Sequence, residues 1–236
     1  MLKKIVLIIF ISISTFNCVS TFSSRNPADV DIFQTEFEET VSKLDGEDST
    51  IHLNEELKRS LAIYSSNMFP MTNRNLRKEN LVDDSSFMYS ICRIDAAIKV
   101  AHIQTKNLIL FRGHNYLPSD NAKQPGYIFS DRAYLSTSLS LEVAKKFAKL
   151  SGNPKVIDII EFEEQQIPGI WLDPISFYGR KSVLENEREY EVLLARNLKF
   201  KLVKTKQKYD YFYRFFIFDG FIDKSIKETI DCSTLL

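Results

Sequence analysis

An acidic stretch runs straight into an apolar strand in the last quarter of the chain. Side chains alternate between the two faces of a strand, so Tyr190, Val192 and Leu194 are expected to share one face. Glu189 and Glu191 then lie on the opposite face, about 6.5–7 Å apart. That spacing lets one ligand meet both carboxylates while both stay ionised. The alternative is that the two acids form the solvated side of an ordinary alternating strand.

The order of the predicted elements indicates an α+β fold. Helical periodicity comes first, and its segments are residues 29–44, 55–64 and 84–98, with a connector at 64–77. Strand patterns then dominate, at residues 107–111, 133–138, 155–162, 189–194, 199–204 and 209–218. One helix, at 141–150, interrupts them, and its Val143, Phe147 and Leu150 are expected to face the core. Residues 171–180 read as a loop.

Composition and missing motifs exclude several classes of protein. Acidic and basic residues number 31 each, so no global field favours nucleic acid or an anionic membrane. The chain has no Gly-x-Gly-x-x-Gly, no phosphate loop with Gly-Lys, no Gly-x-Ser-x-Gly and no histidine pair at metal-binding spacing. Classical dinucleotide folds, nucleotide hydrolases, serine hydrolases and zinc enzymes are therefore disfavoured.

The first 24 residues have the layout of an export signal. Two lysines precede the apolar run 5–13, and small and polar residues follow it. We expect the mature protein to be secreted or anchored at a surface. Cys18 resembles a lipoprotein cleavage site loosely, because the usual leucine three positions earlier and the usual small residue just before it are both missing. A lipid anchor at Cys18 and simple cleavage both stay open.

The remaining cysteines, Cys92 and Cys232, form an even pair in an oxidising compartment once Cys18 is removed or acylated. They are expected either to form a disulfide or to be two unconnected thiols, with Cys92 buried on a helix. The count alone leaves both arrangements open.

Three polar signatures occupy predicted strand positions in a fixed order: Phe-Arg-Gly at 111–113, Ser-Thr-Ser at 136–138 and Glu-x-Glu at 189–191. Together they resemble the arginine-specific mono-ADP-ribosyltransferases of the Arg–Ser–Glu class, which includes bacterial toxins and eukaryotic surface enzymes. The segment 72–77 is similar to the family's Ile-Asn-x-x-Leu-Arg, and an Ala-x-x-Phe-Ala helix follows Ser-Thr-Ser as it does in the family. The resemblance covers about residues 55–205.

The export signal and this resemblance together predict a domain plan. Residues 1–24 are the signal peptide, 25–54 a helical extension and 55–236 the ADP-ribosyltransferase domain. The implied fold is α+β, with N-terminal helices followed by a mainly antiparallel two-sheet core.

The resemblance also implies roles for the three signatures. Glu191 would hold a ribose hydroxyl of NAD⁺ and stabilise the positive charge that develops as the nicotinamide–ribose bond breaks. Glu189 would bind the acceptor guanidinium and take its proton, since a protonated guanidinium is a poor nucleophile. Ser136 would orient Glu191, Arg112 would grip the pyrophosphate bidentately, and Gly113 would let the backbone approach the ligand closely.

Five further residues complete the implied site. Thr137, Ser138 and Phe147 belong to the expected NAD⁺-binding set, and Phe177 and Tyr178 lie where the family places its target-recognising turn. The alternative is that these two aromatics merely pack the loop. Toxins of the family often carry an aromatic-then-arginine loop after Ser-Thr-Ser, whereas this chain has a predicted helix there, which puts the second phosphate contact in doubt. No metal or other cofactor is implied.

The function implied is transfer of ADP-ribose from NAD⁺ to an arginine of a target protein, by a secreted bacterial effector. One alternative is an NAD glycohydrolase, in which water is the acceptor. Another is a catalytically silent surface binding protein of the same fold. No nucleic-acid partner is expected.

Overall fold

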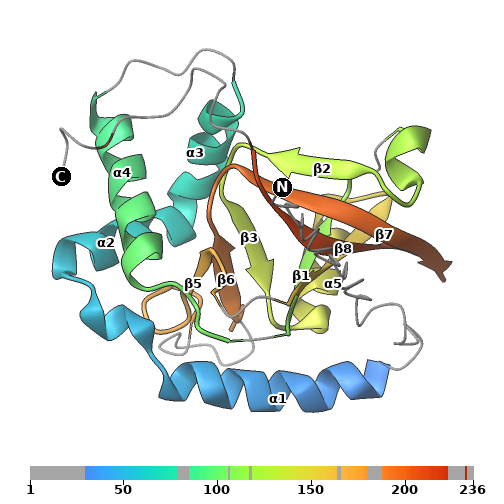
Figure 1. Ribbon diagram of the computed structural model, residues 1–236, viewed down its shortest axis with the longest axis horizontal. Helices are drawn as coiled ribbons and strands as arrows, with labels where there is room; N and C mark the ends of the chain where they lie inside the picture. Colours follow the sequence, from blue (N-terminus) through green and yellow to red (C-terminus); the bar gives the residue numbers. More distant parts are fainter. Residues whose placement is uncertain are drawn as a thin grey trace, which may run out of the picture.

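The computed structural model describes residues 30–78, 85–105, 107–116, 119–163, 166–179, 188–222 and 232. Helices come first and a sheet of eight strands follows (Figure 1). The predicted α+β class is therefore confirmed. The predicted export signal, with Cys18, lies outside the described residues. None of the helices within those ranges is long and apolar enough to cross a membrane.

The N-terminal half is helical. Its elements are α1 (Val30–Gly46), the 3-10 turn η2 (Ser49–His52), α2 (Glu55–Ile63), the π-helical turn η3 (Tyr64–Met68), α3 (Phe69–Leu76) and α4 (Ser85–Val100). The Asn54 side chain caps α2 by accepting a hydrogen bond from the Leu57 amide, 2.9 Å away. The expected connector at 64–77 is wrong, because this segment continues α2 as η3 and α3. Pro70 does not interrupt it, since a proline in the first turn of a helix lacks no needed hydrogen bond.

The strands follow in the order β1 (Leu108–His114), β2 (Ile128–Asp131), β3 (Leu135–Ser138), β4 (Lys155–Phe162), β5 (Gly169–Trp171), β6 (Glu191–Leu194), β7 (Leu198–Lys208) and β8 (Tyr211–Phe221). The 3-10 turn η4 (Asp120–Lys123) precedes β2, and α5 (Leu141–Ser151) follows β3. Every pairing is antiparallel except that of β4 with β8. The sequence pattern missed β2 and β5, which are short.

Hydrogen bonds join all eight strands into one sheet, in the order β2-β7-β8-β4-β1-β3-β6-β5, rather than the two separate sheets expected. The link between β1 and β3 is a single pair, Phe111 with Ser138. Side chains from both sides of this link, such as Leu110 of β1 and Val192 of β6, share one core cluster, which α1 also joins through Leu44. The sheet therefore curls around a common core, with its bend at the Phe111–Ser138 pair.

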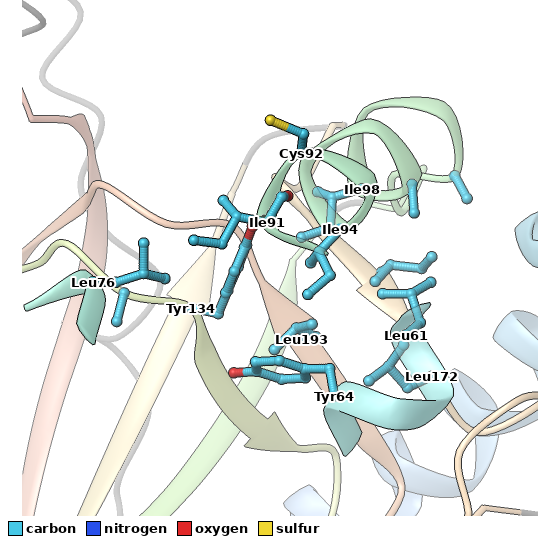
Figure 2. Packing of buried hydrophobic residues seen from close by; sticks show 14 of the residues in the cluster. Leu61, Tyr64, Leu76, Ile91, Cys92, Ile94, Ile98, Tyr134, Leu172 and Leu193 are labelled. Carbon is cyan, nitrogen blue, oxygen red and sulfur yellow. Dashed lines mark hydrogen bonds between the residues drawn. The ribbon is translucent and has the colours of Figure 1, made fainter. Parts of the chain in front are cut away.

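A second core packs α2, η3, α3 and α4 against the opposite face of β5 and β6 and against Ala133 and Tyr134, just before β3 (Figure 2). Leu61 and Ile91 are fully buried there, and Tyr64 stands edge-on to Tyr134 with ring centroids 5.5 Å apart. Cys92, in the same core, forms a disulfide with Cys232, with the two Cα atoms 5.4 Å apart. Of the two alternatives for these cysteines, the structure has the disulfide, which holds residue 232 against α4.

A third core lies under α5, and it corrects the predicted orientation of that helix. Ala144 and Ala148 are the buried residues, whereas Phe147 is 38% exposed and Leu150 is 73% exposed. The reason is the close approach of the helix to β1, where a Cβ added at Gly113 would lie 1.7 Å from the Ala144 carbonyl oxygen. Only small residues fit at such a contact.

Candidate active site

A cavity of about 790 Å³ opens between η3, α3, α5 and the ends of β1, β3 and β6. Of the predicted site residues, all but Phe177 line it, and they are Arg112, Gly113, Ser136, Thr137, Ser138, Phe147, Tyr178, Glu189 and Glu191. Phe177 is 69% exposed and stands edge-on to Tyr178, with ring centroids 5.0 Å apart. The fold thus brings three sequence signatures from distant parts of the chain into one cleft.

Glu191 is the first residue of β6 and pairs with Ser138 in the ladder. Its side chain is buried, and its Oε2 atom has no hydrogen-bond partner among the described residues. Burial, and after it the charge of Glu189, raise the pKa of Glu191 to about 8, while a hydrogen bond with Ser136 acts in the opposite direction. A buried carboxylate with an unused oxygen in a cleft is arranged to bind a ligand.

Tyr64 lies near enough to Glu191 to interact with its charge, and Asn73 contacts Tyr64. The Asn73 amide donates a hydrogen bond of 2.9 Å to the Tyr64 hydroxyl, which is also hydrogen-bonded with Ser136. Burial and the nearby Glu191 raise the pKa of Tyr64 well above its ordinary value. Sequence analysis placed Asn73 in a family-like segment without a role, and it missed Tyr64, which no local pattern marks.

Glu189 does not lie on the strand. Tyr190 adopts the left-handed backbone region, with φ of +49°, and β6 begins only after it. The backbone of Glu189 is held on both sides: its amide donates to the Tyr178 carbonyl at 2.9 Å, and its carbonyl accepts from the Ser138 hydroxyl at 2.6 Å. Glu189 is therefore fixed by a short loop beside the cavity.

The hydroxyl groups of Thr137 and Ser138 donate hydrogen bonds to β6 and to the loop just before it. Thr137 donates to the Val192 carbonyl at 2.7 Å, and Ser138 donates to the Glu189 carbonyl while accepting from the Ser140 amide at 3.0 Å. These contacts tie β3 to both glutamates. The structure thus shows these two residues positioning the acids, in addition to lining the cavity.

Arg188 anchors the loop that leads into β6. Its guanidinium donates to Asp173, with a shortest contact of 2.6 Å, and to Asp45 at the end of α1, at 3.2 Å. Asp45 also accepts from the Trp171 indole at 3.2 Å, and Arg188 lies over the Tyr190 ring, 4.5 Å from its centroid. Helix α1, expected within the extension at 25–54, thereby contacts the support of the site.

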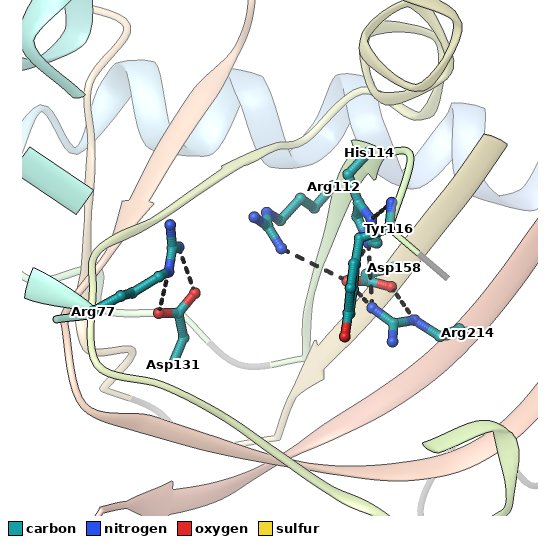
Figure 3. Close-up of polar contacts among 7 residues, drawn as sticks. All are labelled: Arg77, Arg112, His114, Tyr116, Asp131, Asp158 and Arg214. Atoms are coloured by element: carbon teal, nitrogen blue, oxygen red, sulfur yellow. Dashed lines mark hydrogen bonds and ion pairs between the residues drawn. The ribbon is translucent and has the colours of Figure 1, made fainter. Parts of the chain in front are cut away.

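Arg112 lies on the opposite wall, within a network that crosses three strands (Figure 3). The ladder pairs Arg112 with Asp158 of β4, and Asp158 with Arg214 of β8. Asp158 accepts from Arg214 at 2.6 and 2.9 Å and lies 3.0 Å from His114 Nε2. Burial alone would raise the pKa of Asp158, but the charges and hydrogen bonds of His114 and Arg214 hold it well below its usual range.

Arg77 brings a second guanidinium to the cleft. Its Nε and Nη2 atoms donate to the two carboxylate oxygens of Asp131 at 3.0 and 2.6 Å, a bidentate pair that fixes its orientation. Figure 3 shows Arg112 extending from β1 toward the side of the cleft where Arg77 lies. Two oriented guanidinium groups on one cavity suit a ligand with two phosphates. The family-like segment 72–77 was the available signal for Arg77.

Solved structures share this fold. Plx2a, an ADP-ribosyltransferase toxin from Paenibacillus larvae, matches with a TM-score of 0.62 and 20% identity over 78% of this chain and 96% of that chain. Vis toxin, an ADP-ribosyltransferase from Vibrio splendidus, matches with a TM-score of 0.60 and 19% identity over 87% and 90%; it has also been solved in complex with agmatine. Exoenzyme S from Pseudomonas aeruginosa, in complex with human 14-3-3 protein beta and bound to carba-NAD, matches with a TM-score of 0.55 and 19% identity over 82% and 90%.

The fold is therefore that of the ADP-ribosyltransferase toxins. The family described as ADP-ribosyltransferase exoenzyme matches residues 35–214. The chain belongs to this family, whose substrate is NAD⁺. Among curated proteins, no sequence matches the chain.

Proposed function

We propose that this protein transfers ADP-ribose from NAD⁺ to an arginine side chain of a target protein. The observation that carries the proposal is the placement of Glu189 beside Glu191 in one cleft that also holds Ser136 and Arg112. Family membership supplies the NAD⁺ chemistry. The two-acid arrangement supports the choice of acceptor, and the agmatine complex of the similar Vis toxin agrees with it, because agmatine carries a guanidinium group.

The NAD⁺ half of the reaction needs two things from the cleft. Arg112, and on the facing side Arg77, would hold the pyrophosphate, since guanidinium groups match phosphate oxygens in charge and geometry. Glu191 would accept a hydrogen bond from a ribose hydroxyl and stabilise the oxocarbenium-like transition state with its negative charge. Its unused Oε2 atom is available for that contact. The nicotinamide leaves with the electron pair of the broken carbon–nitrogen bond.

The acceptor half needs a second carboxylate. A guanidinium has a pKa above about 12 and must lose a proton to attack the ribose carbon. Glu189 would pair with the guanidinium, orient it, and accept that proton as the new nitrogen–carbon bond forms. Phe177 and Tyr178 precede this loop on the chain, and the exposed Phe177 would contact the target protein around the arginine.

The test is incubation of the full chain with labelled NAD⁺ and agmatine, following nicotinamide release and label transfer separately. We expect both signals from the wild type, neither from Glu191→Gln, and release without transfer from Glu189→Gln. The exposed Glu39→Gln serves as a matched control and should retain both. Release without transfer by the wild type would favour a glycohydrolase, and the absence of both signals in a folded protein would favour a silent binding protein.

We further propose that the chain is exported, with residues 1–24 acting as the signal. The support is the arrangement of Lys3 and Lys4, the apolar run and the small polar residues. Mass measurement of the mature N-terminus after expression in a bacterium tests it. A mass that retains the first 24 residues contradicts export by cleavage, and an added diacylglycerol on Cys18 identifies the lipoprotein route.

A further inference from the structure

A second cavity, of about 320 Å³, lies on the other side of α5. Leu141, Glu142, Lys145 and Lys149 line it from the helix, whereas Ala144, Phe147 and Ser151 of the same helix line the catalytic cleft. Its facing wall comes from the hairpin of β7 and β8. The helix thus separates two cavities that share no lining residue, and the second one has no part in the proposed chemistry.

The second cavity is strongly cationic. Four lysines line it, Lys145, Lys149, Lys206 and Lys208, against the single acid Glu142, a net formal charge of +3. Glu142 pairs with Lys145 at 2.5 Å. Among the described residues, neither Lys149 nor Lys206 forms an ion pair with a carboxylate, although Asp210 at the hairpin tip interacts with the charge of Lys149. Such a concentration of like charge attracts anions to the cavity.

The neighbouring Lys204 on β7 also experiences the positive charge of one of these lysines. Burial lowers the pKa of Lys204, and the charge of Lys206 lowers it further. The charge of Glu161 acts on Lys204 in the opposite direction, so the pKa of Lys204 is lowered despite a neighbouring acid. The accumulated positive charge of the lysines that line the cavity favours an anionic occupant.

Tyr211 gives an independent sign of a ligand. The residue is 8% exposed and lines the cavity, yet its hydroxyl has no hydrogen-bond partner among the described residues. A buried hydroxyl without a partner costs free energy, on the order of 1–3 kcal/mol, so it marks a place where a polar atom is missing. An oxyanion in the cavity would accept this hydrogen bond and receive the charge of the lysines.

The other tyrosines set the shape of the ligand. Tyr213 lies beside Tyr211 with ring centroids 6.0 Å apart, and Tyr209 stands at the hairpin tip, 85% exposed, beneath the Lys208 ammonium. Aromatic faces of this kind pack against the flat apolar side of a ring. The volume lies at the lower end of the range for small-molecule pockets, which is about 300–1,000 Å³.

We propose that this lysine–tyrosine pocket, formed by Lys145, Lys149, Lys206, Lys208, Tyr209, Tyr211 and Tyr213, binds a sugar-sized ring that carries a phosphate or sulfate ester. The ester oxygens contact the ammonium groups of Lys149 and Lys206 and accept a hydrogen bond from the Tyr211 hydroxyl. The ring packs against Tyr209 and Tyr213. A phosphorylated metabolite and a sulfated glycan are two sources of this one chemistry.

The test is calorimetric titration of the full chain with glucose 6-phosphate, glucose 6-sulfate and unmodified glucose. We expect at least one ester to bind and glucose to bind at least tenfold more weakly, and the preferred ester identifies the source. Binding of glucose as strong as that of the esters, or no binding by either ester, overturns the proposal.

Three variants locate the binding. The double substitution Lys149→Gln, Lys206→Gln should weaken ester binding at least tenfold, and Tyr211→Phe should weaken it several-fold, with nicotinamide release from NAD⁺ unchanged as a check of folding. The matched control, Lys146→Gln with Lys201→Gln, changes the same charge on the same helix and strand outside the pocket, and it should bind like the wild type. Equal loss in the control shows unspecific attraction, and loss in Arg112→Ala places the ester in the catalytic cleft; either result overturns the proposal.

Discussion

Arg112 on β1 and Asp158 on β4 stand directly opposite each other in the ladder, with Arg112 Nη1 4.0 Å from Asp158 Oδ2. Asp158 in turn faces Arg214 on β8, so three neighbouring strands set a cation, an anion and a cation side by side. The Arg214 side chain is 3% exposed, whereas that of Arg112 is 27% exposed. The buried pair therefore belongs to the fold, and the more exposed Arg112 is the member available to a substrate.

Replacing Arg112 should affect substrate binding more than stability. Arg112→Lys keeps the positive charge but loses the planar guanidinium group. We therefore expect the KM for NAD⁺ to rise about tenfold or more, which corresponds to about 1.4 kcal/mol of binding free energy. The free energy of unfolding should change little, because Asp158 keeps Arg214 and His114. Nicotinamide-release kinetics and urea unfolding measure the two effects. Arg59→Lys, an exposed arginine outside the cleft, is the control, and an equal KM change there would contradict the role.

Removing Asp158 should act on the fold itself. Asp158→Asn leaves the guanidinium of Arg214 buried without its counter-ion, for which we expect a loss of about 3–5 kcal/mol in the free energy of unfolding. The pKa of Asp158 is depressed, so its stabilisation is present at neutral pH and is lost as the pH falls below the usual carboxyl range. Urea unfolding at pH 7 measures it. Asp210→Asn, which breaks the exposed pair with Lys155, should change stability far less.

Gly113 should prove essential for helix packing. Gly113→Ala places a methyl group against the backbone of α5, 1.7 Å from the Ala144 carbonyl oxygen before any relaxation, and backbone cannot move aside cheaply. We expect a loss of about 1–3 kcal/mol or more in the free energy of unfolding. Gly46→Ala, where an added Cβ meets nothing within 4 Å, is the matched control and should be neutral or slightly stabilising. A stable Gly113→Ala with weakened NAD⁺ binding would instead favour the ligand-approach role expected from the sequence.

The residues that a local pattern can mark all line one cleft. Arg112 and Ser136 lie within strands and Glu191 begins one, and each has a recognisable neighbour on the chain, so their order could be read directly. The α+β class followed from the order of periodicities. The face shared by Val192 and Leu194 was also correct, since both pack in one core cluster.

What the sequence could not supply depends on contacts between distant segments. Asp158 and Arg214 meet Arg112 only through the register of β4 with β1 and β8, which no local periodicity encodes. The orientation of α5 was predicted wrongly because hydrophobicity placed Phe147 inward, whereas the close approach at Gly113 admits only alanines. The single sheet and the helical segment containing Tyr64 were missed for the same reason: tertiary packing overrode the local signals.

The pH dependence of NAD⁺ cleavage should report Glu191. With its pKa raised to about 8, the carboxylate is mostly protonated at neutral pH in the free enzyme, so kcat/KM for nicotinamide release should rise as the pH increases through about 8. Glu189→Gln removes a negative charge that raises this pKa, so the rising limb should move to lower pH. Initial rates between pH 6 and 9 measure the limb. A limb that stays in place in Glu189→Gln would show that the two acids do not interact electrostatically.

The same carboxyl group should make the fold less stable as the pH rises. The pKa of Glu191 is higher in the folded state, about 8, than its ordinary value of 4.5, so between these two values the folded protein binds more protons than the unfolded chain. The free energy of unfolding contributed by this group therefore falls as the pH increases through that window. By about pH 8 the resulting loss in the free energy of unfolding is on the order of a few kcal/mol.

Glu191→Gln removes that titration while keeping the shape of the side chain. We expect the variant to be more stable than the wild type at pH 8, with the difference shrinking toward pH 5, although it no longer cleaves NAD⁺. Urea unfolding of both proteins at several pH values measures this difference in the free energy of unfolding. The exposed Glu39→Gln variant is the control and should be as stable as the wild type at every pH. A difference that does not depend on pH would mean that Glu191 is not held in a desolvated site. A difference that grows with pH would instead show that the destabilisation results from placing a carboxylate where water is excluded, which also strengthens its interaction with a developing positive charge.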